Sequence, residues 1–226
     1  YTSKVWYITG ASKGIGRSLV EQLLKHDYRV AATSRQLDAL PANAGYGIGG
    51  AVEELSEQEI NDNFNVNFFA VVKVIQQVLP YLRTNRSGHI INISSIAGFA
   101  PGTGWSIYAA AKSAITGLSD ALANELKLLE YMLPLFYPAF RTHFAKPGSI
   151  VFSAKQLDDY NFLRPGHRQF IEMDGKQLGN PDKVAQALME LVNVSNPPTH
   201  LFLGSDAFKR ASDKIQVLSE QLETWK

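Results

Sequence analysis

The stretch KVWYITGASKGIG, residues 4–16, decides the fold class. Residues 4–8 are apolar, β-branched or aromatic, and they predict a short buried strand. Apolar side chains at 15, 19, 23 and 24 recur at helical spacing, so a helix follows directly. Glycines at 10, 14 and 16 keep β-carbons out of the turn between strand and helix. This order predicts a dinucleotide site, because a helix N-terminus offers free N–H groups and a positive dipole end to a pyrophosphate.

Strands and helices alternate along the rest of the chain. Apolar runs predict further strands at 28–34, 89–94, 131–136 and 200–204. Helical patterns cover 57–79 and 107–129, begin again at Asn180-Pro181, and end with 205–225. The helix at 57–79 is apolar over most of its surface, so we expect it to be buried on more than one side. Residues 1–226 are therefore predicted to form a single α/β domain, a Rossmann-type doubly wound parallel sheet with helices on both faces.

The composition and charge of the chain argue against several classes of function. The chain has 226 residues, a formal net charge of +1 and no cysteine. The small net charge gives no reason to expect nucleic acid or an anionic membrane as a partner. The absence of cysteine excludes disulfides and thiol catalysis, and the five histidines show no ligand spacing, so we expect no metal. No run is long and apolar enough to cross a bilayer, and a cytoplasmic protein is expected.

The glycine turn permits a second interpretation. Residues 10–14, GASKG, also satisfy G-x-S-x-G, the serine nucleophile motif of α/β hydrolases. Ser12 would then be the nucleophile, with His143 or His167 proposed as its base. However, Ser12 follows the first strand, so no earlier loop is available to supply the second oxyanion donor. The dinucleotide interpretation is favoured.

The residues after the second predicted strand indicate which dinucleotide binds. NAD enzymes commonly place a carboxylate there to hold the ribose 2′-hydroxyl, and NADP enzymes place a basic residue. This chain has Ser34 and Arg35 at that point, and Lys13 in the glycine turn adds a second cation. An arginine can hold a phosphate through two parallel hydrogen bonds. NADP(H) is therefore the predicted cofactor.

A tyrosine and a lysine lie one helical turn apart in SIYAAAKSA, residues 106–114. Positions i and i+4 share a helix face, so the heads of Tyr108 and Lys112 can meet. A lysine that snorkels beside a partly buried tyrosine would give the same pattern. The functional alternative is that the ammonium stabilises the phenolate and lowers the pKa of Tyr108 from its ordinary value of about 10.

Taken together, TGASKGIG (9–16), NAG (43–45), FNVNFF (64–69), INISS (91–95) and YAAAK (108–112) resemble the short-chain dehydrogenase/reductase family. The resemblance implies that Tyr108 is the catalytic acid and base and that Lys112 activates it. It also implies that Ser95, thirteen residues before Tyr108, orients the substrate and that Asn67 completes the tetrad. The implied activity is an NADP(H)-dependent hydride transfer between nicotinamide and a carbonyl or secondary alcohol. A non-catalytic dinucleotide sensor or scaffold of the same fold is the alternative.

The resemblance and the glycine turn together predict the cofactor-binding residues. These are Gly10, Ser12, Lys13, Gly14, Ile15, Gly16, Ser34, Arg35, Asn43, Ala44, Gly45, Tyr108, Lys112, Pro138 and Thr142.

The family also implies where the substrate binds and how subunits associate. Residues 140–179 occupy the position of its substrate lid, and the substrate is expected to be a hydrophobic ketone or alcohol. The helices at 57–79 and 107–129 resemble those that pair between subunits, which implies a homodimer or homotetramer. The aromatic residues expected to line the pocket are Phe99, Trp105, Phe140, Phe144, Phe152 and Tyr160.

The sequence departs from the family pattern between SRQLDAL (34–40) and PANAGYG (41–47). A crossover unit of about 30 or more residues should separate these motifs, and the family has there a strand beside the first one. We therefore expect that residues are omitted between about 40 and 42. Three single departures are Ala42 in place of an asparagine, Ala139 in place of a glycine, and Pro134 inside a predicted central strand.

Overall fold

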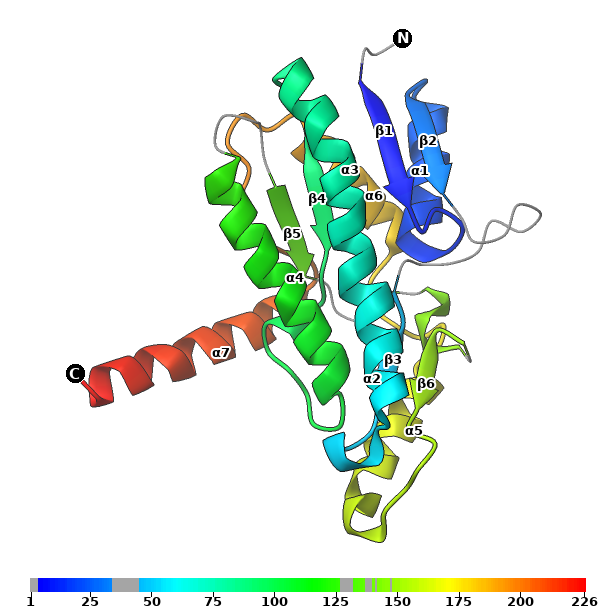
Figure 1. The fold of residues 1–226 in the computed structure, drawn as a ribbon, viewed down its shortest axis with the longest axis vertical. Helices are drawn as coiled ribbons and strands as arrows, with labels where there is room; N and C mark the ends of the chain where they lie inside the picture. The colour runs from blue at the N-terminus through cyan, green and yellow to red at the C-terminus, as the bar shows by residue number, and fades with distance from the viewer. Residues whose placement is uncertain (1–3, 34–44, 127–131, 137–139, 141, 147) are drawn as a thin grey trace.

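The computed structural model describes residues 4–33, 45–126, 132–136, 140, 142–146 and 148–226 (Figure 1). The strands are β1 (Val5–Thr9), β2 (Arg29–Thr33), β3 (Gly47–Gly49), β4 (Ile90–Ile93), β5 (Met132–Phe136), β6 (Ile150–Phe152) and β7 (Leu201–Phe202). The α-helices are α1 (Gly14–Lys25), α2 (Glu57–Phe64), α3 (Ala70–Asn85), α4 (Ser106–Glu125), α5 (Arg164–Glu172), α6 (Pro181–Leu191) and α7 (Ser205–Thr224). Each strand and helix predicted from the sequence has a counterpart here.

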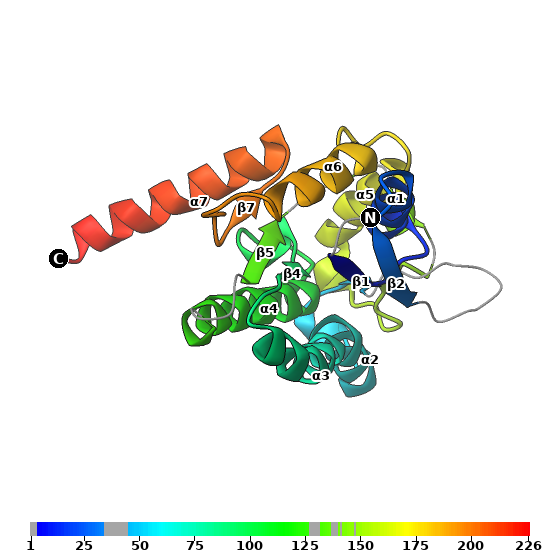
Figure 2. The ribbon, with the colours of Figure 1, turned by 90° about the horizontal axis from the view of Figure 1, so that it is seen from above.

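All strand pairs in the described part of the chain are parallel, as the sequence predicts. They form three separately hydrogen-bonded groups: β1 with β2, β4 with β5 and β7, and β3 with β6. Helices α1 and α6 lie on one side of the strands, and α3 and α4 lie on the other (Figure 2). The two-sided cover is that of a doubly wound α/β domain.

The largest core lies between β1, α1 and α6. Ile8 of β1 is 7% exposed, and Leu19 and Leu23 of α1 point toward it with 6% and 0% exposure. Val184 and Leu188 of α6 close the cluster from the other helix. Their i, i+4 spacing places each pair on one helix face, which is why α1 and α6 pack along their length.

One expectation about burial is wrong. The predicted helix 57–79 consists of α2, a single π-helical segment η2 (Asn65–Phe69), and α3. In α3 only Ile75 is buried, although the helix carries a long apolar face. That apolar face lines a cavity, described below, and is not covered by a described strand.

Two strands were missed by sequence analysis. β3 and β6 have three residues each and pair with one another away from the other strands. β3 has the sequence Gly-Ile-Gly, which is too short and too glycine-rich to predict a strand. Pro134 does lie inside β5, opposite Asn92 of β4, so the departure noted in the sequence falls within a ladder.

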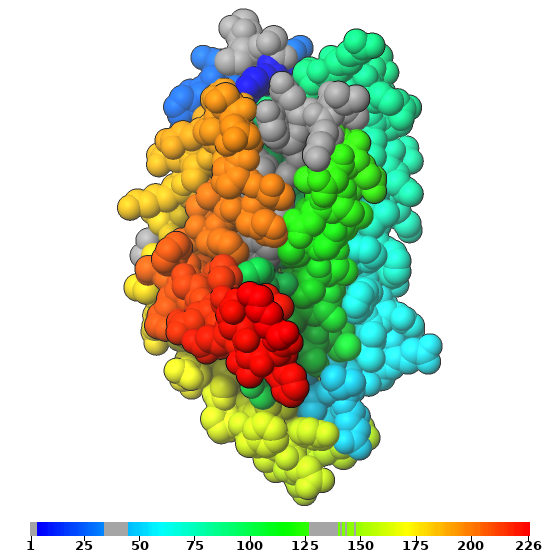
Figure 3. Space-filling model, turned by 90° about the vertical axis from the view of Figure 1, so that its left-hand side faces the viewer, coloured from blue at the N-terminus to red at the C-terminus, as the bar shows by residue number. Residues whose placement is uncertain are grey.

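The last helix, α7, extends away from the body of the molecule (Figures 1 and 2), and in Figure 3 its red C-terminal residues point toward the viewer. Of its residues only Ala207 and Ala211, near its first turn, are buried. None of the helices in the described residues has the length and hydropathy that crossing a bilayer requires.

Candidate active site

The glycine turn joins β1 to α1 in a geometry that only glycine permits. A β-carbon on Gly16 would lie 2.4 Å from the carbonyl oxygen of Gly10, so the first turn of α1 presses directly on the end of β1. Gly14 has φ +54° and lies against Thr142, whose Cγ2 would be 3.0 Å from an added β-carbon. Within the described chain, no side chain caps α1 at Lys13. Its first N–H groups are therefore available to an anion.

Ser12 lies inside this turn, and its side chain decides between the two interpretations of the motif. It is 1% exposed, and its Oγ has no hydrogen-bond partner among the described residues. A serine nucleophile needs a base within hydrogen-bond reach, so this geometry does not support a hydrolase. A buried hydroxyl without a partner is instead suited to bind a group that enters the turn.

Tyr108, Lys112 and Ser95 meet below the turn. Tyr108 and Lys112 lie on α4 and are 5% and 6% exposed, and Ser95 follows β4 and is 7% exposed. The Tyr108 hydroxyl is hydrogen bonded with Ser95. Lys112 Nζ lies 6.0 Å from the centre of the Tyr108 ring and donates to the carbonyl oxygen of Ile93 at 3.3 Å. The neighbouring Ser94 has a structural role, because its Oγ donates to the Lys112 carbonyl oxygen.

Burial has the largest effect on the pKa values of Tyr108 and Lys112. It raises the pKa of Tyr108 to about 12, against a lowering by the hydrogen bond with Ser95. It lowers the pKa of Lys112 to about 8. The direction is opposite to the lowering expected from Lys112, because removal of the phenolate from water is the larger effect on the pKa of Tyr108. At neutral pH Tyr108 is protonated, which is the form that can donate a proton.

Asn67 lies in the π-helical segment η2, a feature often found at functional sites. It is fully buried, and its Nδ2 donates to the carbonyl oxygens of Tyr46 at 2.9 Å and Asn63 at 3.1 Å. Its Oδ1 has no partner among the described residues. Gly45 fits between this oxygen and Lys112, since an added β-carbon would lie 2.7 Å from Oδ1 and 3.5 Å from Nζ.

The adjacent Asn63 was not singled out by the sequence. It is 0% exposed, donates to the same Tyr46 carbonyl oxygen at 3.1 Å, and also has an unpartnered Oδ1. Asn63 lies four residues before Asn67, and this spacing could have indicated that the two side chains share one helix face.

Six of the twelve predicted site residues in the described chain line one cavity of about 1400 Å³. Its lining includes Gly10, Gly45, Tyr108, Lys112 and Phe144. Two further site residues lie next to residues of the cavity lining. Ser95 is hydrogen bonded with Tyr108, and Asn67 lies beside Gly45. Five predicted cofactor or site residues lie outside the described chain: Ser34, Arg35, Asn43, Ala44 and Pro138. Ala42, Ala139 and the break near 40–42 lie outside it as well.

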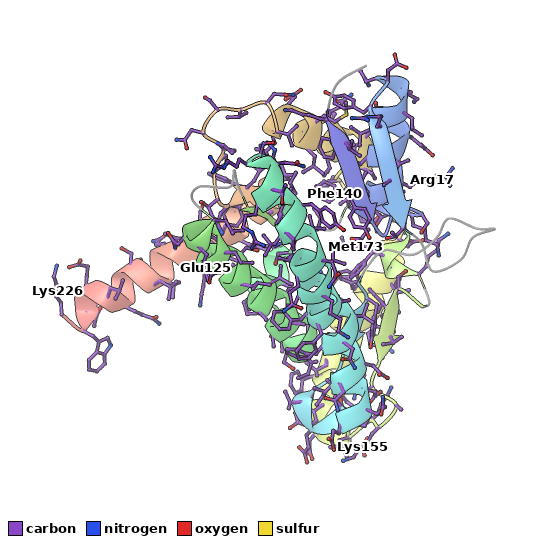
Figure 4. All side chains as sticks on the ribbon, turned by 45° about the horizontal axis from the view of Figure 1, so that its top comes forward. Arg17, Glu125, Phe140, Lys155, Met173 and Lys226 are labelled. Carbon is purple, nitrogen blue, oxygen red and sulfur yellow. The ribbon has the colours of Figure 1, made fainter. Side chains whose placement is uncertain are left out.

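The expected aromatic pocket is only partly correct. Phe144 lies 5.9 Å from the Tyr108 ring, and Trp105 packs on Phe152 at 6.0 Å. Phe140 is buried in the α1–α6 core (Figure 4), and Phe99 packs on Phe202 beside α7. Tyr160 is bonded to Glu53 at the surface. Phe140, Phe99 and Tyr160 are therefore not pocket residues, because neighbouring apolar or acidic groups hold them elsewhere.

An ion pair that the sequence did not reveal fixes the predicted lid. Glu54 is 1% exposed, contacts the Arg164 guanidinium, and accepts from the Leu157 and Ala51 N–H groups at 2.9 and 3.0 Å. The hydrogen bond from Arg164 is the main reason that the pKa of Glu54 falls to about 2. Lys155, in the same segment, lies at the lower end of the molecule in Figure 4, away from Arg17 of α1.

Glu54→Gln should loosen this segment. The neutral amide leaves Arg164 partly buried without its counter-ion, which costs about 3 kcal/mol for a buried pair. Because the folded pKa of Glu54 lies below its ordinary value, the stabilisation is present above about pH 4.5 and is lost as the pH falls toward 2. Limited proteolysis and thermal unfolding at pH 7 should both show the loss. Glu172→Gln, an exposed carboxylate in α5, is the control and should change neither. Equal behaviour of the two variants would contradict the assignment.

The residues present fit a dinucleotide. The uncapped N-terminus of α1 and the buried Ser12 hydroxyl suit a pyrophosphate, and the cradle at Gly45 brings a flat group close to Lys112 and Tyr108. The fold and site together define a dinucleotide-binding oxidoreductase of the doubly wound α/β class.

Comparison with known proteins agrees with this class. A family model described as short chain dehydrogenase matches residues 32–130. A 3-ketodihydrosphingosine reductase from Bacteroides thetaiotaomicron is 32% identical, over 96% of this chain and 91% of that protein. That alignment runs over 255 positions, more than the 226 residues of this chain, so the relative carries residues that this chain lacks.

Solved structures share the fold. A short-chain dehydrogenase from Streptomyces avermitilis has a TM-score of 0.89 and 27% identity, over 99% of this chain and 97% of that one. A Burkholderia phymatum family member in complex with NAD has a TM-score of 0.76 at 20% identity, over 99% and 95%. One from Sphingobium yanoikuyae in complex with NADPH has a TM-score of 0.70 at 20% identity, over 96% and 95%. The chain belongs to the short-chain dehydrogenase/reductase family.

Proposed function

We propose that the protein reduces a hydrophobic ketone, or oxidises the matching secondary alcohol, with NADP(H) as the hydride carrier. The observation that supports this most directly is the burial of Tyr108, Ser95 and Lys112, because Tyr108 and Lys112 line the large cavity together with glycines of the turn. A sensor or scaffold would bind dinucleotide without needing these three polar side chains to be buried together. The relatives found carry oxidoreductase names, which also disfavours that alternative.

Each side chain has a distinct role in the proposed reduction. When bound, the nicotinamide would supply the hydride that the carbonyl carbon accepts. Tyr108 gives its proton to the carbonyl oxygen, and Ser95 donates a second hydrogen bond that stabilises negative charge as it develops there. In this proposal the Lys112 ammonium would stabilise the phenolate left behind and would also donate to the nicotinamide ribose. The unpartnered Oδ1 of Asn67 is suited to hold a water through which Tyr108 regains a proton.

The cofactor preference rests on two cations. Arg35 follows β2 in sequence, no carboxylate takes its place, and Lys13 begins α1. A guanidinium there pairs with the 2′-phosphate of NADPH and gains nothing from the 2′-hydroxyl of NADH.

Arg35→Glu should therefore reverse the preference. We expect kcat/KM with NADPH to fall about a hundredfold and kcat/KM with NADH to change little or rise. Lys25→Glu, at the far end of α1, changes the net charge equally and should leave the ratio unaltered. The assay follows the loss of nicotinamide absorbance with a panel of ketones. A wild type that prefers NADH would contradict the assignment of NADP(H).

The substrate class follows from the surroundings of Tyr108. Phe144 borders its ring and lines the cavity, together with apolar residues of β1, α3 and β4. Aromatic walls favour a bulky apolar ketone over a small polar one, because the binding free energy comes mainly from apolar area removed from water. The Bacteroides relative is named a 3-ketodihydrosphingosine reductase, and a keto substrate in that name supports reduction of a ketone here. In the ketone panel, kcat/KM should rise with apolar size.

A further inference from the structure

The outer half of α7 carries apolar side chains that nothing in the described chain covers. The base of the helix is anchored, because Ala207 and Ala211 are 0% and 3% exposed and pack with Ile96. The Arg210 guanidinium also donates to the carbonyl oxygen of Ala100. From residue 215 onward every residue is exposed, and the helix leads away from the body (Figures 1 and 2). Lys226 marks its far end in Figure 4.

The uncovered apolar side chains form one stripe along the helix. Apolar residues recur from Phe208 to Trp225 at alternating steps of three and four residues. This is the spacing of the a and d positions of a coiled coil. The last four members are between 42% and 89% exposed, and we call them the seam: Ile215, Leu218, Leu222 and Trp225. The seam continues the stripe that Ala211 begins, so a surface that packs on the body at the base of α7 is open beyond it.

The outer half of α7 lacks the packing that ordinarily stabilises a helix. Residues 212–224 extend about 20 Å beyond the anchored base. An isolated helix of this length is marginal in water, because helices in proteins are stabilised mainly by the burial of an apolar face. On the polar side Gln216 donates to Glu220 at 2.9 Å, and such a pair stabilises an isolated helix only slightly. A partner that packs on the seam would supply the missing burial.

The charge of α7 favours a second copy of the helix over a lipid surface. Residues 205–226 carry four basic and four acidic side chains, so this segment has no net charge. A helix that lies on a membrane has a polar face rich in lysine and arginine. The positions that flank the centre of the seam, Ser219 and Gln221, are uncharged. Two identical seams can therefore meet there without bringing like charges together.

We propose that two copies of this chain associate through α7, with their seams packed against each other in antiparallel orientation. A parallel partner would need the space at the base of α7 that the body already fills around Ala211. An antiparallel partner leaves each body at its own end of the pair. Ile215 then lies opposite Trp225 of the second copy, and Leu218 lies opposite Leu222 of the second copy.

The size of the seam sets the strength of the association. One buried aromatic side chain removes about 150–250 Å² from water, so the four seam residues of each copy together bury on the order of 1,000 Å². This area is near the lower limit for a specific interface, and the seam spans fewer heptads than an independent coiled coil needs. The assembly should therefore dissociate on dilution.

The first test exploits the absence of cysteine from the chain. Leu218→Cys and Leu222→Cys are prepared as two proteins with different mass tags, mixed, and treated with a short thiol cross-linker. We expect the mixture to form the 218-to-222 cross-link at least about tenfold faster than either variant links to itself, because the antiparallel pair places these positions opposite each other. Faster linking of each variant to itself would indicate a parallel pair and would overturn the proposal.

A matched control has the same spacing on the polar side of α7. Gln216→Cys and Glu220→Cys are also four residues apart, and both positions are exposed. Their mixture should cross-link no faster than either protein does alone. Equal rates for the control mixture and the seam mixture would mean that the links arise from random collision, which would also overturn the proposal.

The second test is the mass of the assembly by analytical ultracentrifugation over a range of concentrations. Leu218→Glu combined with Leu222→Glu places two carboxylates on the seam, and Gln216→Glu places one on the polar side. At high concentration we expect the double variant to have about half the mass of the wild type, and Gln216→Glu to match the wild type. Contacts through other surfaces are common to all three proteins and cancel from this comparison.

Two outcomes of these experiments would contradict pairing through α7. The first is an unchanged mass in the double variant. The second is a wild type that shows no mixed cross-link and instead sediments with phosphatidylcholine–phosphatidylserine vesicles through the seam, which would make a lipid surface the occupant. Neither experiment measures turnover, so their failure leaves the proposed function untouched.

Discussion

Tyr108→Phe should reduce kcat by about a hundred- to ten-thousandfold while leaving dinucleotide binding within a factor of about two. The substitution removes the hydroxyl that donates the proton and keeps the ring that packs on Phe144. The free energy of unfolding should change little, since the hydroxyl has one bond with Ser95 to lose. The measurement is steady-state turnover with NADPH and the best ketone of the panel, together with a fluorescence titration of NADPH.

Tyr28→Phe is the matched control, because that tyrosine packs on Trp6 away from the cavity mouth. Its kcat should equal that of the wild type. Full activity of Tyr108→Phe would remove the phenol from the chemistry and, with it, the proposed function.

Lys112→Met should have two opposite effects, a loss of activity and a gain in stability. Methionine fills nearly the same volume but carries no charge, so the phenolate loses its stabilising neighbour and kcat should fall about a hundredfold or more. Burial lowers the pKa of Lys112 to about 8, which means that the folded state holds its proton less tightly than the unfolded chain. The charged form is thus unfavourable in the folded protein at neutral pH, and its removal should raise the free energy of unfolding by about 2 kcal/mol.

The pH dependence of the free energy of unfolding tests independently whether the charged form of Lys112 destabilises the folded protein. Between pH 8 and about 10 the unfolded chain binds more protons at this lysine than the folded protein does, so wild-type stability should rise with pH. That rise should be absent in Lys112→Met. Lys73→Met, an exposed lysine of α3, is the control and should retain it. A loss of stability in Lys112→Met would mean that the ammonium is not buried as the structure has it.

The parts of the fold that carry a strong local signal could be predicted from the sequence. The strand, turn and helix of residues 4–25 follow from apolar periodicity and three glycines, and the i, i+4 pair of Tyr108 and Lys112 follows from helix geometry. The proximity of Ser95 to this pair depended on the resemblance to a family, because no local rule brings the end of β4 beside α4.

The parts that depend on packing could not be predicted. Phe140 and Phe144 are both aromatic and four residues apart, yet one lies in the α1–α6 core and the other beside Tyr108. The Glu54–Arg164 pair joins residues 110 apart in the chain, for which a single sequence carries no signal. The pKa of Tyr108 was predicted in the wrong direction, because the sequence shows the neighbouring charge but not the extent of burial.

In the proposed reaction Tyr108 donates its proton to a carbonyl oxygen that lies beside the nicotinamide. A crystal structure of the protein with NADP+ and a slowly reacting ketone tests this most directly. We expect the ketone oxygen to lie within hydrogen-bond distance of both Tyr108 Oη and Ser95 Oγ, with the carbonyl carbon facing the nicotinamide ring. A ketone oxygen that contacts neither hydroxyl, or a dinucleotide bound away from the glycine turn, would contradict it.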